Sequence, residues 1–485
     1  MTRTLTRTLG LLLALAMVVL AAACGGTQPT PTSGTTPTGG TTPTVEATPT
    51  EEPGKPMKTT ELGSEIPDVD LGDDTVVKWI GIRQPQFLSN GTGVVYEFFK
   101  KYYGGTIEMD VTAPGEVYTK LASLVLSGEA PDIVPSMGGG FPNLAILDII
   151  APVDGLIDFE DELFANYKDT YDQFEFDGSR YWIPWVADNL SFTYYNTKIF
   201  EDNGLETPKE LFEQGLWDWD AFTEYAQELY IDENSDGVPE RWGAAMCIWH
   251  DARMVLTTSE SIVKVDGANI LSNLGSPNVE RAYNFLVDLT QKLKVVDPND
   301  DPNNVIELLN TGKAAMMTGP DFWSGDNNVM LDIKKAKQLE WAPYPKDPQA
   351  DKHYVPGETI GFYVPKGVTI GPKMQAFVYS CMAAMKEAGI KGGEAYQKGI
   401  DEFMEVWGEY YTVEEYEAIG EYNKVINSLP LIPEPFQGMM DLDVILSAMQ
   451  GVGGAAPLTY QQAVAQLEPT LNAAIEAVLN PQTAE

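Results

Sequence analysis

The chain has 485 residues, 44% of them hydrophobic, and carries 71 Asp or Glu against 31 Lys or Arg. The formal net charge of −40 argues against nucleic acid or an anionic lipid surface as a partner, because both are bound through basic patches. With two histidines, three cysteines and no HExxH, GxSxG, P-loop or CxxC pattern, the sequence lacks the usual residues of metal-dependent and serine-type catalysis.

Residues 1–23 have the pattern of an export signal. Arg3 and Arg7 precede an apolar run, Leu9 to Ala23, that is shorter than the roughly 20 residues needed to cross a bilayer. The small residues before Cys24 resemble the lipobox of bacterial lipoproteins. That resemblance implies cleavage before Cys24, diacylation of its thiol and membrane attachment through the lipid. A plain secretory signal with an incidental cysteine is the alternative.

Residues 24–72 are predicted to form the lipidated cysteine and a disordered tether. As far as about Pro56 this segment is Thr, Pro and Gly with almost no apolar residue, so it cannot bury enough surface to fold. A coil of roughly thirty residues has a root-mean-square span of about 30 Å. The tether would therefore hold a folded body clear of the membrane.

The body after the tether begins with alternating strand and helix patterns. Its roughly 430 residues exceed the size at which one core usually stops growing, which favours two domains. Strands are expected at 75–82, 107–111 and near 128–135, with helices at 93–103 and 116–127. This alternation predicts an α/β fold with a largely parallel sheet. Ligands of such sheets collect beyond the carboxyl ends of the strands.

Four blocks in the chain resemble segments of the extracellular solute-binding proteins that serve ABC importers, the family of maltose-binding protein. They are Gly128-x-x-Pro-Asp-Ile-Val134, Asp177–Pro184 with Tyr194–Lys198, Trp217–Phe222, and Gly312–Trp323. The resemblance implies a two-lobed periplasmic-binding-protein-like fold of type II with a hinge. Lobe I would comprise 73–186 and 343–405, and lobe II 187–342 and 406–480. The sequence departs from the family pattern after Gly357, and its acidic, aromatic stretch Glu402–Tyr422 is unusual for the family.

The function that the resemblance implies is that of a receptor and not an enzyme. Two lobes would close on a carbohydrate, expected to be an oligosaccharide, and deliver it to an ABC permease. The protein would be an exported monomer, lipid-anchored to the outer face of the cytoplasmic membrane or in the periplasm. No cofactor is expected apart from a structural calcium ion.

A sugar site needs aromatic faces with carboxylates and amides at their rims, because sugars present apolar ring faces and polar edges. Asp188 also lies where the resemblance places a sugar-binding carboxylate. Tryptophan is more often a core residue, and Glu116 has a second interpretation as a first-turn acid that complements a helix dipole. The predicted ligand-binding residues are Gln84, Glu116, Trp185, Asp188, Asn189, Trp249, Asp321, Trp323 and Glu358.

The segment Asp232-x-Asn234-x-Asp236-Gly-Val238-x-Glu240 has the spacing of a calcium loop. Its twelfth position is glycine and not the bidentate glutamate. A calcium-free turn rich in Asx residues is an equally valid interpretation of the same spacing, and either role is structural.

Two further functions fit the residues. An exported glycoside hydrolase would also place carboxylates and aromatic rings in a cleft. A polyamine, peptide or other cation could instead be bound by Asp188, Asp251, Asp321 and Glu358. Cys247 and Cys381 are expected as buried free thiols, although a disulfide is possible in an exported protein.

Overall fold

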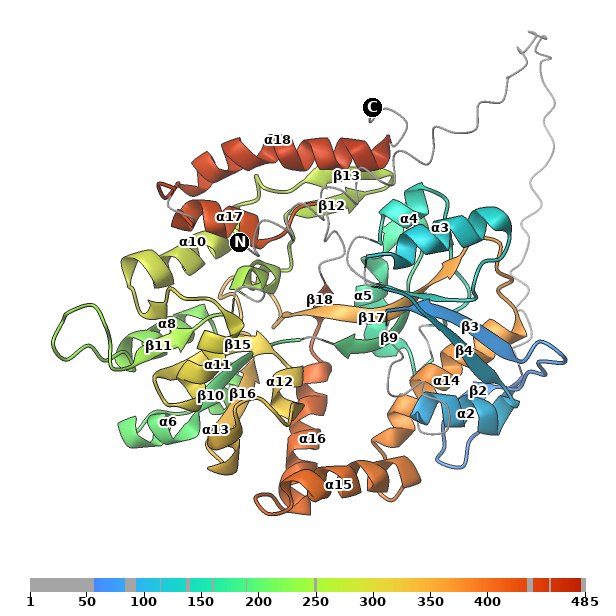
Figure 1. Cartoon of the computed structure of the whole chain (residues 1–485), viewed down its shortest axis with the longest axis horizontal. Helices are drawn as coiled ribbons and strands as arrows, with labels where there is room; N and C mark the ends of the chain where they lie inside the picture. Colours follow the sequence, from blue (N-terminus) through green and yellow to red (C-terminus); the bar gives the residue numbers. More distant parts are fainter. Residues whose placement is uncertain are drawn as a thin grey trace, which may run out of the picture.

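The computed structural model describes residues 56–82, 93–113, 115–136, 140–158, 161–188, 190–247, 251–433, 439–452 and 455–480. They form an α/β body of two lobes, seen at the left and right of Figure 1 with β9, β17 and β18 between them. Over these residues, no helix is both long and apolar enough to cross a membrane.

Lobe I, at the right of Figure 1, is built on two parallel strands. Strand β3 (Val76–Gly81) pairs in register with β4 (Thr106–Val111), and Trp79 forms a parallel bridge to Ile133. Helices α2 (Val94–Tyr103) and α3 (Val117–Ser127) follow these strands. The parallel strands and their helices confirm the sequence prediction to within two residues.

The further elements of lobe I are β1 (Met57–Thr59), β2 (Glu65–Pro67), β5 (Val134–Pro135), α4 (Asn143–Ile146), β6 (Ile150–Ala151), η3 (Ala165–Tyr167), α5 (Lys168–Asp172), β7 (Glu175–Phe176), β8 (Ser179–Arg180), β9 (Ile183–Asp188), β17 (Val355–Pro365) and α14 (Pro372–Ala388). Strands β5, β6 and β9 each pair antiparallel with β17, so the prediction of a largely parallel sheet is correct for β3 and β4 but wrong for this part of lobe I. Helix α14 packs on α2, with the rings of Phe99 and Phe377 in edge contact at 5.8 Å.

Lobe II, at the left of Figure 1, contains a five-stranded sheet in the order β14-β11-β15-β10-β16. Its strands are β10 (Ser191–Asn196), β11 (Trp242–Ala245), β14 (Val296–Asp297), β15 (Ala314–Pro320) and β16 (Leu339–Pro343). Every residue of β10 and β15 is buried, as expected for central strands covered on both faces. Strand β10 runs antiparallel to its neighbours, whereas β11 is parallel to β15.

The remaining elements of lobe II are α6 (Thr197–Asn203), α7 (Pro208–Glu213), α8 (Trp219–Glu228), η4 (Ala252–Thr258), β12 (Val263–Asp266), β13 (Asn269–Ser272), α10 (Pro277–Val287), η5 (Asp288–Lys292), α11 (Pro302–Asn310), α12 (Phe322–Gly325), α13 (Leu331–Lys335), α17 (Asp443–Gln450) and α18 (Tyr460–Leu479). Helix α8 begins at Trp219, within the family block Trp217–Phe222, because the Asp218 carboxylate caps it by accepting a hydrogen bond from the Ala221 N–H at 2.9 Å.

Three segments connect the lobes. Strand β9 leads into β10, β16 leads into β17, and α15 (Glu394–Trp407) and α16 (Val413–Asn427) lead into β18 (Leu431–Pro433). Strand β18 pairs parallel with β17, with Leu431 opposite Val355. In Figure 1, α15 lies across the bottom of the picture and α16 rises from it toward β18; this helix-turn-helix, residues 394–427, is the α15–α16 hairpin. A second contact between the lobes joins the tips of two β-hairpins, where the Asp177 N–H donates to the Gly267 carbonyl at 3.0 Å.

Two of the predicted boundaries need correction. The tether was expected to end at residue 72, but β1 and β2 already form a hairpin whose Ile66 is fully buried. The lobe boundary at 405/406 falls inside α15, a continuous helix. Cys247 and Cys381 are both buried free thiols, as expected.

Candidate functional site

The carboxyl ends of the lobe I strands share one edge of the lobe. The segments that leave β3, β4 and β5 there are 82–93, 112–116 and 136–142. Glu116 lies in the second of these as the N-cap residue of α3, and its exposed side chain makes no capping hydrogen bond. Gln84 lies outside the described residues.

Two predicted acids lie on opposite positions of β9 and β17, the paired strands that pass from one lobe to the other and form the interlobe crossing. Asp188 and Glu358 are direct Cα partners in this antiparallel pair. Trp185 lies at a β-bulge, because Val186 is opposite Ile360 while Pro184 is opposite Gly361. Such bulges are common beside functional sites, where they redirect a side chain. The description of 184–188 and 358–360 covers the backbone alone, and Asn189 lies outside it.

The lobe II sheet brings Asp321 to the same crossing. Parallel strands β11 and β15 end at one edge, where Pro320 pairs with Ser191 at the start of β10. The Asp321 N–H donates to the Leu190 carbonyl at 2.8 Å. Leu190 is two residues after Asp188, so the segments that carry Asp188, Glu358 and Asp321 are joined through backbone pairing.

A buried tyrosine holds the start of α12 at this position. The Tyr194 hydroxyl lies 2.7 Å from the Pro320 carbonyl oxygen and 3.0 Å from that of Asp321, and it accepts from the Ser324 N–H at 3.1 Å. Burial raises the pKa of Tyr194 well above its ordinary value, so the hydroxyl keeps its proton. The phenol therefore fixes the Asp321 backbone relative to β10.

Trp323 is a core residue of lobe II in this structure. Its side chain is 6% exposed and packs in one cluster with Leu190, Met317 and Trp341. A Cβ added at Gly319 would lie 2.4 Å from the Trp323 ring, so the strand approaches the indole too closely for any side chain. The ring faces of Trp323 are thus covered by protein.

The neighbouring Phe322 is the aromatic residue that faces out, and sequence reasoning missed it. It is 53% exposed at the first position of α12, directly after Asp321. Its ring meets Trp323 edge to face, with centroids 6.4 Å apart. The segment Gly-Pro-Asp-Phe-Trp contains two adjacent rings, and nothing in its local pattern tells which one packs inward.

The second aromatic segment of lobe II is described only in part. Trp249 lies outside the described residues, whereas Asp251, two positions later, is described and is 8% exposed. Burial, then the nearby Asp300 and Asp443 carboxylates, raise the pKa of Asp251 well above its ordinary value of 3.8. A buried carboxyl that favours its neutral form is a poor partner for a cation.

The calcium-like segment forms a loop closed by side-chain to backbone hydrogen bonds. Asn234 Oδ1 accepts from the Asp236 N–H, Asp236 Oδ1 from the Val238 N–H, and Glu240 Oε2 from the Glu233 N–H. Asp232 Oδ1 is buried without a hydrogen-bond partner in the described part of the chain. Among those same residues, no group of three or more His, Cys, Asp or Glu side chains has the arrangement to hold a metal ion.

Comparison with known proteins places the chain in a family. A family model described as bacterial extracellular solute-binding protein matches residues 94–384, which is more than half of the chain. The diacetylchitobiose binding protein DasA of Streptomyces coelicolor is 27% identical over 215 residues. That alignment covers 42% of this chain and 46% of DasA, so the chain matches less than half the length of this relative.

Solved structures share the fold at low sequence identity. UspC of M. tuberculosis has a TM-score of 0.58 at 15% identity, over 82% of this chain and 100% of UspC. A cyclo/maltodextrin-binding protein complexed with maltotetraose has a TM-score of 0.56 at 14% identity, over 85% and 99%. The GacH receptor of Streptomyces glaucescens, solved unliganded and with acarbose, has a TM-score of 0.52 at 16% identity, over 83% and 98%.

These identities show the two-lobed fold alone, and the family follows from the match over residues 94–384. The chain belongs to the bacterial extracellular solute-binding proteins.

Proposed function

We propose that this protein is the extracytoplasmic receptor of an ABC importer and closes its two lobes on a carbohydrate, most simply an oligosaccharide. The observation that carries the proposal is the junction of Asp188, Glu358 and Asp321 at the crossing of the lobes, with the exposed ring of Phe322 beside it. Segments that carry carboxylates and an exposed aromatic ring would suit the polar edges and apolar faces of a pyranose.

Closure needs contacts that exist only when the lobes are together. A ligand shifts a two-state equilibrium only by its difference in affinity for the two states. A change from mostly open to mostly closed requires roughly 5.5 kcal/mol of such difference. One stacked ring and several charge-assisted hydrogen bonds, each of about 1.5–3 kcal/mol, are of this size.

Membrane attachment is the second part of the proposal. The cysteine at position 24 would carry the lipid, and the Thr/Pro/Gly-rich segment after it would be the tether. The folded body begins at β1, so the tether ends near residue 56. A receptor held in this way stays within reach of a permease in the same membrane.

Isothermal titration of the full-length chain tests the sugar proposal. N,N′-Diacetylchitobiose, maltotetraose and acarbose are suitable probes, because relatives and structural neighbours are named for these ligands or were solved with them. We expect saturable binding of at least one neutral saccharide with little dependence on salt. Binding of polyamines alone, weakening steeply with added salt, would contradict it.

A glycoside hydrolase is the second candidate, favoured by one observation. Directly opposite residues of antiparallel strands have Cα atoms about 4.5–5.5 Å apart, so the backbone places Asp188 and Glu358 side by side, and a glycosidase needs such a pair of acids. Recovery of the bound saccharide separates the two functions. Intact saccharide supports the receptor, and cleavage products that accumulate over many turnovers support the hydrolase.

We also propose that the Asp232–Glu240 loop holds a structural calcium ion. Asp232 Oδ1 is buried without a partner in the described residues, and calcium would supply one. Binding would require the loop to rearrange, because its other side-chain oxygens accept backbone N–H groups and no three acidic side chains of the described residues are arranged around an ion. The ion would stabilise lobe II and take no part in sugar binding.

A further inference from the structure

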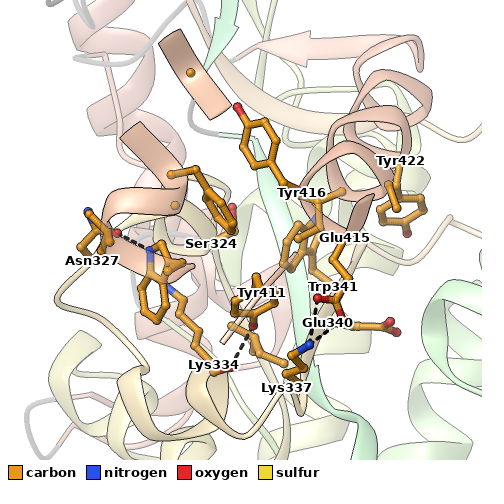
Figure 2. Close-up of a pocket in the computed structure, with 18 of the residues that line it drawn as sticks. Ser324, Asn327, Lys334, Lys337, Glu340, Trp341, Tyr411, Glu415, Tyr416 and Tyr422 are labelled. Atoms are coloured by element: carbon orange, nitrogen blue, oxygen red, sulfur yellow. Dashed lines mark hydrogen bonds and ion pairs between the residues drawn. The ribbon is translucent and has the colours of Figure 1, made fainter. Parts of the chain in front are cut away.

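A cavity of about 650 Å³ lies between lobe II and the α15–α16 hairpin. Figure 2 shows side chains from several elements pointing into this space. Its walls come from edge strand β16, from the α12–α13 region and from the facing sides of α15 and α16. Ligand pockets in proteins typically have volumes of about 300–1,000 Å³.

This cavity is separate from the interlobe crossing. Along β16, Pro343 pairs with Phe192 near the crossing, whereas Leu339 pairs with Asn196 at the opposite end of the sheet. The cavity is lined by Leu339, Glu340 and Trp341, and by none of the β9 and β17 residues whose side chains the structure describes. It therefore lies along the flank of the sheet, under the helical hairpin.

Aromatic side chains dominate the hairpin wall. The Phe403 ring lies 4.6 Å from that of Tyr416 and 5.8 Å from that of Tyr411, measured between centroids. Trp407 continues this row, with its ring 6.2 Å from Tyr411. Trp341 adds an indole from the sheet side. Such walls offer apolar faces to a flat, ring-shaped ligand.

The charges around the cavity balance. Three lysines and three glutamates line it: Lys209, Lys334, Lys337, Glu340, Glu402 and Glu415. Lys337 pairs with Glu415 at 2.6 Å, and Tyr195 donates to Glu340 at 2.7 Å. Lys334 donates to the carbonyls of Trp323 and Asp326, and burial lowers its pKa to about 8. A charged ligand would find no excess of opposite charge here.

From these observations we propose that the cavity under the α15–α16 hairpin is a second ligand site, which takes a neutral saccharide of one or two rings. The half-buried rings of the aromatic row, Phe403, Tyr411 and Tyr416, would stack against the apolar ring faces of the sugar. This assignment does not rest on sugar binding at the interlobe crossing.

Thiol protection tests occupancy of the cavity directly. Val406 lines the cavity and is 48% exposed, while Val425 is 52% exposed on α16 and lies outside the lining. Val406→Cys and Val425→Cys are therefore matched probes for labelling with a maleimide. The full-length chain is labelled in a detergent without a sugar head group, and the parent chain gives the background of the native thiols.

The probes are glucose, maltose and cellobiose, each added up to its solubility. We expect at least one to slow labelling of Val406→Cys and to leave Val425→Cys unchanged. The assignment is overturned if none of the three slows labelling, if both variants are slowed equally, or if only charged compounds such as putrescine or citrate protect.

Failure of this proposal is distinguishable from failure of the receptor proposal. Phe322→Ala alters the interlobe crossing and should leave protection of Val406→Cys unchanged. If no saccharide binds at the crossing but Val406→Cys is still protected, the receptor proposal fails and the second site stands. If protection disappears in Phe322→Ala, the two sites are one and the second site is refuted.

Discussion

The exposed ring of Phe322 gives the sharpest prediction for the interlobe site. An aromatic side chain offers about 200 Å² of surface, and 53% exposure leaves roughly 100 Å² for a ligand to cover. At about 25 cal/mol per Å², full coverage is worth up to ~2.5 kcal/mol. A sugar ring that stacks on one face covers about half of this, or ~1.2 kcal/mol. We therefore expect Phe322→Ala to weaken saccharide binding roughly eightfold.

The free energy of unfolding should change little in this variant, because substitutions of exposed side chains usually alter stability by less than about 0.5 kcal/mol. Isothermal titration gives the affinity, and thermal unfolding without ligand gives the stability. Val425→Ala is the matched control, since Val425 is 52% exposed and lies on α16. Equal saccharide affinity in Phe322→Ala and the parent chain would refute the stacking role of this ring.

Three other substitutions test separate parts of the structure. Trp323→Ala should destabilise the chain by about 3–5 kcal/mol in urea unfolding, because it empties a buried site; a loss below about 1 kcal/mol would contradict its place in the core. Asp251→Asn should raise the melting temperature at neutral pH. The pKa of Asp251 is about 3.8 in the unfolded chain and higher in the folded state, so native stability falls as the pH rises from 3.8 through the folded-state pKa. The gain should shrink toward about pH 4, and a gain independent of pH would count against the buried acid. Calcium should raise the melting temperature of the parent chain but not of Asp236→Ala, and equal melting temperatures in calcium and EDTA would exclude the calcium site.

Local patterns were enough to predict β3, β4, α2 and α3 of lobe I, but not the β1–β2 hairpin, which had been assigned to the tether. The helix expected at 93–103 is α2, and the one expected at 116–127 is α3, each within one residue. Both patterns are set by apolar residues at helical spacing along one stretch of chain. The family blocks then supplied what local patterns cannot, namely that two sheets joined by crossing strands form two lobes.

The interlobe site was predictable only in part. Asp188, Asp321 and Glu358 lie on segments joined by backbone pairing, although they are far apart in sequence. The sequence did not indicate that Phe322, and not Trp323, is the exposed ring, because tertiary contacts decide which of the two packs inward. Gly319 makes room for the indole, and residues of the neighbouring strands cover it.

The residues that line the cavity under the helical hairpin formed a recognisable pattern in the sequence, but the pattern did not predict a cavity. The stretch Glu402–Tyr422 stood out as acidic and aromatic, and it departs from the family pattern. Its rings come together only because α15 and α16 fold back on each other and face β16, another segment with its own tryptophan. Spacing within one stretch carries no information about such a distant partner.

Recovery of bound saccharide tests the central claim most directly, that the two lobes hold a sugar without altering it. The full-length chain is incubated with a panel of labelled neutral oligosaccharides, separated from free ligand, and the retained label is analysed by mass. The receptor proposal predicts retention in a fixed molar ratio with the mass of the saccharide unchanged. Cleaved products in excess of the protein, or no retention of any saccharide in the panel, would contradict it.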